Sequence, residues 1–401
     1  MKAFLVGLLL FLVCFGPKFG FLDTSLLASI ILLTVTCFFK KYLTVNKQFL
    51  SVLAIMTIIS AYSIVVYFSS GFADSYVVLR ALRSTITTLC IGIFILNSNF
   101  REKSIINYLL IFLSINSAVV LLQIIFPQLQ VHMASITGFD KKFSPIRAFG
   151  LTPGYDSAGY LCVVGLIFVI FRIVTEGIKG KNIILIYYFV VSGFFTGRSV
   201  MIIMVFVLVA LNIFLLFKGK LIFKAFSMVN FFVGGVIVYN FVLPILMTTL
   251  PFLMSHSISS TVIDTGNLKD SFASSSGDQL ADMFFLPPDP ISSILGTGIN
   301  PHDSDVGYIK LIHMIGFVGL AFTIALYVYI LANCRFNKKA SSDQKDRLIL
   351  ERSLFIITIF LFLFNLKTLY FMSRNFHEVI IIAFFANSKK HVVAKRKWNF
   401  Q

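Results

Sequence analysis

Long apolar stretches separated by short basic ones run along most of this chain. A helix needs roughly 20 apolar residues to cross a lipid bilayer, and the spacing of the apolar stretches predicts twelve such helices. The predicted helices cover residues 3–16, 21–39, 49–69, 79–97, 105–126, 157–173, 183–196, 199–217, 225–247, 307–333, 353–371 and 376–388. The pattern therefore predicts an all-α, polytopic membrane protein in which residues 1–401 form a single integral-membrane domain.

The positions of lysine and arginine predict the orientation of these helices. Most of the 34 lysines and arginines fall in every second connection, beginning with Lys2 and ending with the basic tail after residue 388. The cytoplasmic connections of membrane proteins carry such an excess of positive charge. We therefore predict that both termini lie in the cytoplasm, which agrees with an even number of spans.

The composition excludes several other classes of protein. Hydrophobic residues make up 58% of the chain and charged residues only 13%, and the mean hydropathy is +0.91, which is too apolar for soluble domains. The net charge of +17 follows the topology, so nucleic acid is not a predicted partner. The five cysteines show no CxxC or metal-ligand spacing, so we expect neither disulfides nor a zinc site.

Two segments on the predicted outer side are much longer than the other connections. The first covers residues 127–156 and the second covers residues 247–306. The second holds seven aspartates and a single lysine, so it is too polar to cross the membrane, and its apolar patches predict short helical pieces. Loops of this length are usually functional or disordered. We therefore look for chemistry on the outer side.

The end of the second long segment carries the densest group of polar residues. His302, Asp303 and Asp305 follow a glycine-rich turn and precede Gly307, where an apolar helix is predicted to begin. A neutral histidine can accept a hydroxyl proton, and an aspartate can do so or orient a sugar. His302 and Asp303 are therefore candidates for a catalytic base, together with Asp305 and with Asp156 of the first long segment. The alternative is that His302 is an ordinary surface-loop histidine.

Five arginines lie at or near the predicted outer ends of the helices: Arg80, Arg83, Arg147, Arg198 and Arg374. The planar guanidinium binds two phosphate oxygens at once and keeps its charge, so arginine suits a diphosphate. For Arg80 and Arg83, which share a helix face, snorkelling or structural pairing is an equally good explanation. For Arg147 and Arg198 we favour a binding function, because the positive-inside rule makes arginine less expected on this side. No GxxxxGK[ST] phosphate loop is present, so ATP is not expected.

Three local motifs resemble those of a known family. The first is arginine-x-x-glycine followed by proline and glycine, the second is a Thr-Gly-Arg-Ser turn between two predicted helices, and the third is Gly-x-Gly with a following histidine and Asp-x-Gly-Tyr. The first comprises Arg147, Gly150, Pro153 and Gly154 with the small-residue helix start Ala158 and Gly159. The second comprises Thr196, Gly197, Arg198 and Ser199, and the third comprises Gly296, Gly298, His302, Asp305, Gly307 and Tyr308. With the twelve predicted spans and the two long outer segments, this pattern resembles bacterial O-antigen polymerases of the Wzy type and, more distantly, O-antigen ligases.

The resemblance implies a metal-independent, GT-C-like integral-membrane glycosyltransferase of lipopolysaccharide biosynthesis that uses no cofactor. It implies a location in the bacterial inner membrane and a periplasmic active site that joins oligosaccharide repeat units carried on undecaprenyl diphosphate. A chain-length regulator protein would be a further partner. The roles it implies are diphosphate binding by Arg147 and Arg198, with Arg80 and Arg83 beside them; catalysis by His302 and Asp303; and acceptor-sugar binding by Asp156, Asp305, Tyr308 and Arg374.

Two alternatives stay open at this point. An O-antigen ligase would use the same chemistry, and the sequence separates it poorly from a polymerase. A flippase for the same lipid-linked sugar belongs to a different class of protein. Transporters place their sites near the bilayer midplane and often contain internal repeats, whereas the polar residues here gather at the outer ends of the predicted helices. This distribution favours an extracytoplasmic active site.

Overall fold

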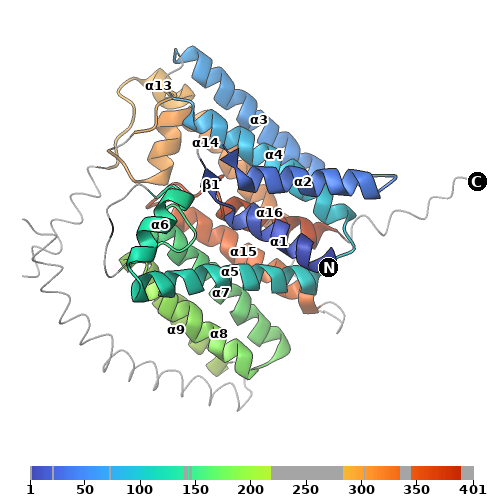
Figure 1. Ribbon diagram of the computed structural model, residues 1–401. Coiled ribbons are helices and arrows are strands. Elements are labelled where there is room, and N and C mark those ends of the chain that lie inside the picture. Colours follow the sequence, from blue (N-terminus) through green and yellow to red (C-terminus); the bar gives the residue numbers. More distant parts are fainter. Residues whose placement is uncertain are drawn as a thin grey trace, which may run out of the picture. The chain divides into compact units, whose positions relative to one another are not determined.

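The computed structural model describes residues 2–19, 22–71, 74–139, Phe143, 147–217, 283–301, 303–334 and 345–389 (Figure 1). The chain divides into two compact units, residues 1–203 with 285–401, and residues 204–284. The described part contains 13 helices and one pairing of two-residue strands, β1 (Lys18–Phe19) with β2 (Leu22–Asp23). Five of these helices are long and apolar enough to cross a membrane, and several shorter apolar helices accompany them. The prediction of an all-α, multi-pass membrane protein is confirmed at this level.

Helices occupy eleven of the twelve ranges predicted from hydropathy. The one remaining range, 225–247, lies outside the described residues. The helices found in these ranges are α1 (Lys2–Phe15), α2 (Thr24–Phe39), α3 (Lys47–Ser69), α4 (Tyr76–Asn97), α5 (Glu102–Ile125), α7 (Tyr155–Glu176), α8 (Gly180–Phe194), α9 (Arg198–Phe217), α14 (Gly307–Ala332), α15 (Lys345–Phe364) and α16 (Phe376–Ser388). Two further short helices, α6 (Gln128–Thr137) and α13 (Pro290–Leu295), lie within the two long segments that were predicted to be outside.

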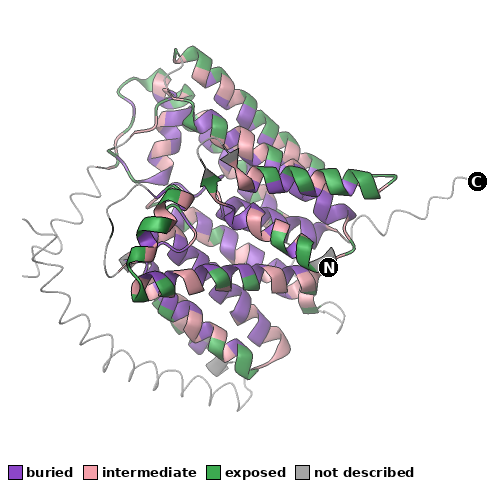
Figure 2. Ribbon diagram, in the orientation of Figure 1, coloured by how far each residue is buried: buried purple, intermediate pink, exposed green. Residues whose placement is uncertain are grey.

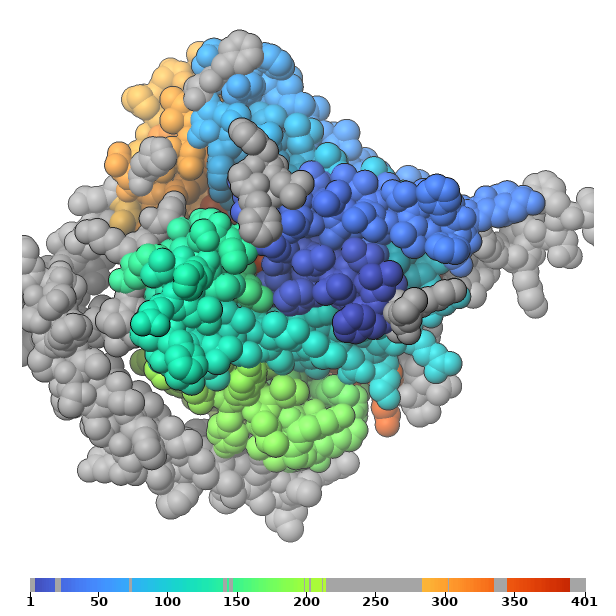
Figure 3. Space-filling model, viewed as in Figure 1, coloured from blue at the N-terminus to red at the C-terminus, as the bar shows by residue number. Residues whose placement is uncertain are grey.

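Helices α7 and α16 form the centre of the first unit (Figure 2). Every residue of α16 is buried, and α7 contributes a continuous buried stretch from Ala158 to Val169. Helix α7 packs on α5, α8 and α15, and α16 packs on α4, α5 and α15. On the face seen in Figure 3, α5 and α8 lie side by side. Because neighbouring helices surround α16, this 13-residue helix need not match the bilayer thickness by its own length.

The end of α15 differs from the range predicted for it. Hydropathy predicts a helix over 353–371, but α15 covers Lys345–Phe364 and residues 365–375 form a compact turn segment. The Asn365 side chain causes this change, because its Oδ1 accepts hydrogen bonds from the backbone nitrogens of Tyr370, at 2.9 Å, and Phe371, at 3.2 Å. Hydropathy registers the apolar residues here but not the capping amide, so the predicted end was wrong. We call residues 365–375 the 365–375 turn.

The first long segment is ordered by polar side chains that project from α5. Gln123 Oε1 accepts from the backbone nitrogens of Phe149 and Gly150, at 3.0 and 2.9 Å. Asn116 Oδ1 accepts from the backbone nitrogen of Leu151 at 2.9 Å. Both side chains are completely buried. Buried amides of this kind need partners, and here they fix the backbone that carries Arg147.

Helix α14 is interrupted at Gly316, whose φ of 65° and ψ of −179° are not helical. The turn after α13 packs into the interruption. Gly296 of this turn approaches Gly316 so closely that a Cβ added to Gly296 would lie only 2.7 Å from the Gly316 nitrogen. Thr297 donates to the His313 carbonyl from both its backbone nitrogen, at 2.6 Å, and its hydroxyl, at 2.8 Å. A carbonyl released by a helix break is thus satisfied by the loop that packs there. This contact anchors the loop that leads to Asp303 and Asp305.

Candidate functional site

Two of the three motifs contact each other directly. Arg147 Nε donates to the Thr196 carbonyl at 2.9 Å, and the backbone nitrogen of Ala148 donates to the Phe195 carbonyl at 2.8 Å. The guanidinium carbon of Arg147 lies 4.6 Å from the centre of the Tyr155 ring, which is within the range of a cation–π interaction. The Thr-Gly-Arg-Ser turn therefore holds Arg147 in one orientation.

Asp156 is the centre of the polar group beside this contact. Lys367 Nζ lies 3.1 Å from each Asp156 carboxylate oxygen, Ser199 Oγ donates to Oδ1 at 3.2 Å, and Lys367 Nζ donates to Ser199 Oγ at 2.9 Å. A Cβ built on Gly197 would lie only 2.5 Å from Asp156 Oδ1. The glycine of the turn is therefore required for this close approach. We call Arg147, Asp156, Gly197, Ser199 and Lys367 the Asp156 cluster.

The Asp156 cluster combines one cation that the protein holds through Nε and an aromatic ring with a second cation that is partly exposed. Asp156 lies in the first turn of α7, where the helix dipole favours a carboxylate. The Lys367 side chain is 42% exposed and that of Asp156 is 17% exposed. An ammonium with this exposure is accessible to a ligand from outside the protein. Among the described residues, the Arg147 guanidinium is contacted through Nε and the Tyr155 ring, and no hydrogen bond engages its two terminal nitrogens.

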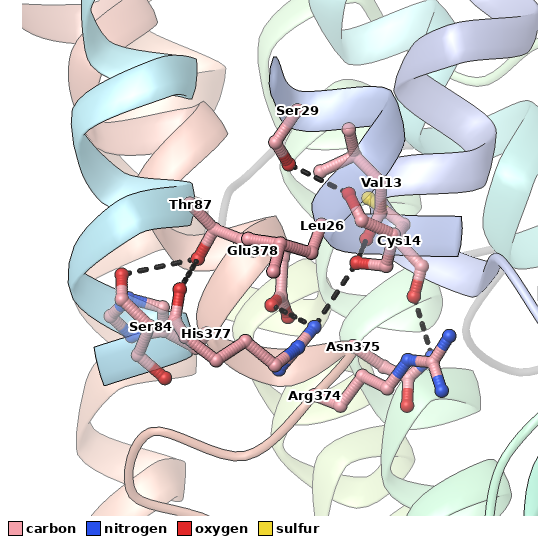
Figure 4. Close-up of polar contacts among 12 residues, drawn as sticks. Val13, Cys14, Leu26, Ser29, Ser84, Thr87, Arg374, Asn375, His377 and Glu378 are labelled. Atoms are coloured by element: carbon pink, nitrogen blue, oxygen red, sulfur yellow. Dashed lines mark hydrogen bonds and ion pairs between the residues drawn. The ribbon is translucent and has the colours of Figure 1, made fainter. Parts of the chain in front are cut away.

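Arg83 belongs to a second group, which consists of Asp23, Arg83, Arg374 and Glu378 and which we call the Arg83 cluster. Arg83 Nε lies 2.8 Å from Asp23 Oδ2, and Arg83 Nη2 lies 2.7 Å from Glu378 Oε1. Arg374 Nη2 lies 3.5 Å from Asp23 Oδ1. In Figure 4, Arg374 and Glu378 extend from neighbouring positions around the start of α16. The Glu378 side chain is fully buried.

The position of Asp23 explains why it pairs with two arginines. Asp23 caps the N-terminus of α2, where its Oδ1 accepts from the backbone nitrogens of Ser25, at 3.0 Å, and Leu26, at 3.3 Å. Burial raises the pKa of the Asp23 carboxyl, but Arg83, Arg374 and the two backbone donors lower it by more, so the pKa falls below its ordinary value. Asp23 is therefore ionised near neutral pH.

Arg80 stabilises the 365–375 turn. Its Nη2 donates to the carbonyls of Leu369, at 3.0 Å, and Phe371, at 2.9 Å, and its Nη1 donates to the Tyr76 hydroxyl at 2.9 Å. Arg80 and Arg83 thus share one side of α4, as their spacing predicts, but both guanidiniums contact protein groups. Structural pairing, which the sequence left open for both arginines, describes the contacts observed.

The third motif adjoins the same turn at its end. Gly307 N donates to the Asn365 carbonyl at 2.9 Å, and the Tyr308 hydroxyl donates to the Phe362 carbonyl at 2.9 Å. Asp303 is exposed, and Asp305, 54% exposed, lies 3.8 Å from Lys310 Nζ. His302 and the side chain of Arg198 lie outside the described residues. The 365–375 turn therefore contacts the end of the third motif and, through Lys367, the Asp156 cluster.

Three further residues were not predicted as site residues. Lys367 fell inside a predicted span, and Glu378 was assigned to the span that begins at residue 376. An ionisable residue within a predicted span is a signal that could have found both, because it needs a partner or a function. His377 is fully buried, between the Thr88 hydroxyl at 2.9 Å and the Tyr327 hydroxyl at 3.3 Å. Nothing in the local sequence distinguishes it.

Comparison with known proteins adds no relative. No family model matches this sequence, and no curated protein matches it. Within the described ranges, no group of three or more histidine, cysteine, aspartate or glutamate side chains could hold a metal ion. The candidate site is therefore defined by the geometry of the Asp156 cluster and by the motifs that contribute to it.

Proposed function

We propose that this protein is an O-antigen polymerase that transfers a growing sugar chain from its undecaprenyl diphosphate carrier to the next lipid-linked repeat unit. The observation that carries the proposal is the contact between two motifs 49 residues apart, in which Arg147 Nε donates to the Thr196 carbonyl at 2.9 Å. In this proposal the chain crosses the bacterial inner membrane twelve times, both termini are cytoplasmic, and the Asp156 cluster faces the periplasm.

The chemistry requires positive charge beside the departing diphosphate. A sugar diphosphate is already activated, so the protein needs no nucleophile of its own but must stabilise the negative charge that develops on the leaving group. Arg147 is held through Nε and the face of Tyr155, which leaves its terminal nitrogens for phosphate oxygens. Lys367 supplies a second cation, which gives up its contact with Asp156 in order to contact a phosphate oxygen. Arg198 follows Gly197 directly and is the third cation that we assign to this role.

The acceptor hydroxyl must also lose a proton during the transfer. The Asp156 carboxylate already receives Lys367 and Ser199, so we assign it to orienting the cations. The base then comes from the loop before α14, with His302 and Asp303 as candidates, and Asp305 and Tyr308 at its end contact the acceptor sugar. Arg80, Arg83 and Arg374 support this site through the 365–375 turn and the Arg83 cluster and do not themselves bind diphosphate.

The proposal is tested first in cells that lack the gene, by gel analysis of their lipopolysaccharide. Core carrying a single repeat unit and no ladder is the expected result. Bare core with long lipid-linked polymer would indicate a ligase, and bare core with single lipid-linked units would indicate a flippase. An unchanged ladder would contradict all three assignments.

Variants then test the Asp156 cluster in the same cells. Arg147→Ala removes the fixed cation and should abolish the ladder, because losing one charge-stabilising donor of this kind costs on the order of 100-fold or more in rate. Arg147→Lys keeps the charge but loses the fork, so it should recover only a small part of the activity. Arg101→Ala, at an exposed residue before α5, is the matched control and should keep the full ladder. Immunoblotting of membranes checks that every variant is present in equal amount.

A further inference from the structure

A groove lies along α5 where this helix packs on α7 and α8. It has a volume of about 460 Å³ and is lined by Asn107, Leu110, Ile111, Ser114, Ile115, Ala118, Arg172 and Leu185. Six of these residues recur every three or four positions on α5, so they form a single stripe on that helix. The stripe covers the twelve residues 107–118, or about 16 Å of helix. The groove is long and mostly apolar, as a hydrocarbon chain requires.

One end of the groove is polar. Arg172 Nη1 donates to Asn107 Oδ1 at 3.3 Å, and both residues line the groove at the end nearest the start of α5. Arg172 Nε also lies 3.3 Å from Glu176 Oε1. The guanidinium is therefore held at the groove end by one amide and one carboxylate. A buried arginine at the end of an apolar groove suits a ligand that has an anionic head and an apolar tail.

The charge around this end is positive. Glu176 also pairs with Lys179 Nζ at 2.6 Å, so a single carboxylate lies between two cations. Lys181 is exposed and precedes the groove residue Leu185 by four positions on α8, which places the two on one side of that helix. Three cations and one carboxylate leave an excess of two positive charges. Basic residues near a membrane surface attract anionic lipid headgroups.

The polar end of the groove is far from the Asp156 cluster. Asp156 and Arg172 lie on the same helix, sixteen residues apart, which corresponds to about 24 Å along α7. This distance is most of the thickness of a hydrocarbon core, about 30 Å. A lipid whose head lies at Arg172 therefore belongs to the opposite leaflet from a substrate bound at the Asp156 cluster, and the basic connections predict that this leaflet is the cytoplasmic one.

We propose that the α5 groove binds an acyl chain of an anionic glycerophospholipid whose phosphate lies against Arg172 and Lys181. The apolar stripe accepts the chain, and the positive end selects the headgroup. The site does not depend on the polymerase proposal, because it lies at the other end of α7 and uses none of the residues of the Asp156 cluster.

The experiment is native mass spectrometry of the purified full chain in detergent, titrated with phosphatidylglycerol or phosphatidylcholine of identical acyl chains. The native protein should retain phosphatidylglycerol preferentially. Arg172→Gln should reduce that preference about fivefold, because a basic residue near a membrane surface contributes on the order of 1 kcal/mol to anionic lipid binding. Lys41→Gln is the matched control, since it removes an equal charge from an exposed position in the connection after α2 that does not line the groove. It should leave the preference unchanged.

A second variant tests the groove without changing any charge. Ala118→Phe fills the end of the groove farthest from Asn107 and should lower the retention of both lipids while keeping the preference between them. Equal retention of the two lipids by the native protein would overturn the proposal, as would an equal loss in Arg172→Gln and Lys41→Gln. Displacement of phosphatidylglycerol by an equimolar amount of a polyprenyl phosphate would also overturn it, since the groove would then belong to a carrier lipid.

Discussion

The buried ion pair between Arg83 and Glu378 allows a quantitative test of the fold around the candidate site. The Glu378 side chain is fully buried, and its Oε1 lies 2.7 Å from Arg83 Nη2, while Oε2 has no hydrogen-bond partner among the described residues. Replacing Arg83 with methionine keeps the side chain long but leaves Glu378 buried without its cation. Breaking a buried pair in this way costs about 3–5 kcal/mol. Asp23 is less affected, because Arg374 Nη2 remains 3.5 Å away.

We expect Arg83→Met to lower the midpoint of thermal unfolding by about 5 °C. The double variant Arg83→Met, Glu378→Met should recover most of this loss, because two apolar side chains of similar volume often replace a buried pair at little cost. Lys179→Met is the control, since Lys179 is 49% exposed and its ion pair with Glu176 should contribute less than about 1 kcal/mol.

The assay uses the cysteines of the protein. Cys14, Cys90, Cys162 and Cys334 are buried and free, so a thiol-reactive fluorophore labels them only when the fold opens, whereas Cys37 is exposed and reacts at the start. When the detergent-solubilised protein is heated with the fluorophore, the increase in cysteine labelling therefore measures unfolding, and tryptophan fluorescence is not needed. The reasoning would be refuted if Arg83→Met unfolded at the native temperature, or if the double variant were less stable than Arg83→Met alone.

Three further predictions follow from individual contacts. Gly316→Ala should destabilise the protein by more than about 2 kcal/mol, because the added Cβ would clash with the Ile294 carbonyl oxygen. The same thermal assay compares it with Gly71→Ala, where φ is similar but a Cβ would meet no atom within 4 Å. The depressed pKa of Asp23 stabilises the folded state above the ordinary carboxyl pKa, near 4, and this contribution is lost as the pH falls through the lower folded value. Thermal unfolding followed against pH should show the loss, and Asp23→Asn should be less stable at pH 7 but less sensitive to acid. Lys367→Met should shorten or abolish the lipopolysaccharide ladder, with Lys41→Met, at an exposed and unrelated position, leaving it intact.

The candidate site was predicted only in part, and the reason lies in how its residues meet. Arg147 and the Thr-Gly-Arg-Ser turn were both identified from local motifs, yet the hydrogen bond that joins them spans 49 residues. The Asp156–Lys367 contact spans 211 residues. Lys367 was not identified as a partner, because hydropathy placed it within an apolar range and gave no indication of what faces it.

Hydropathy along the chain is enough to predict an all-α membrane protein and the places of most of its helices, because an apolar stretch long enough to cross a bilayer is a local property. The positions at which helices end or break, and the charges that form pairs, depend instead on contacts between distant parts of the chain. Asn365 ends α15 through hydrogen bonds to Tyr370 and Phe371, and Gly316 breaks α14 where Gly296 packs against it. Each of these outcomes depends on a partner brought close only by folding, and a hydropathy pattern contains no information about such partners.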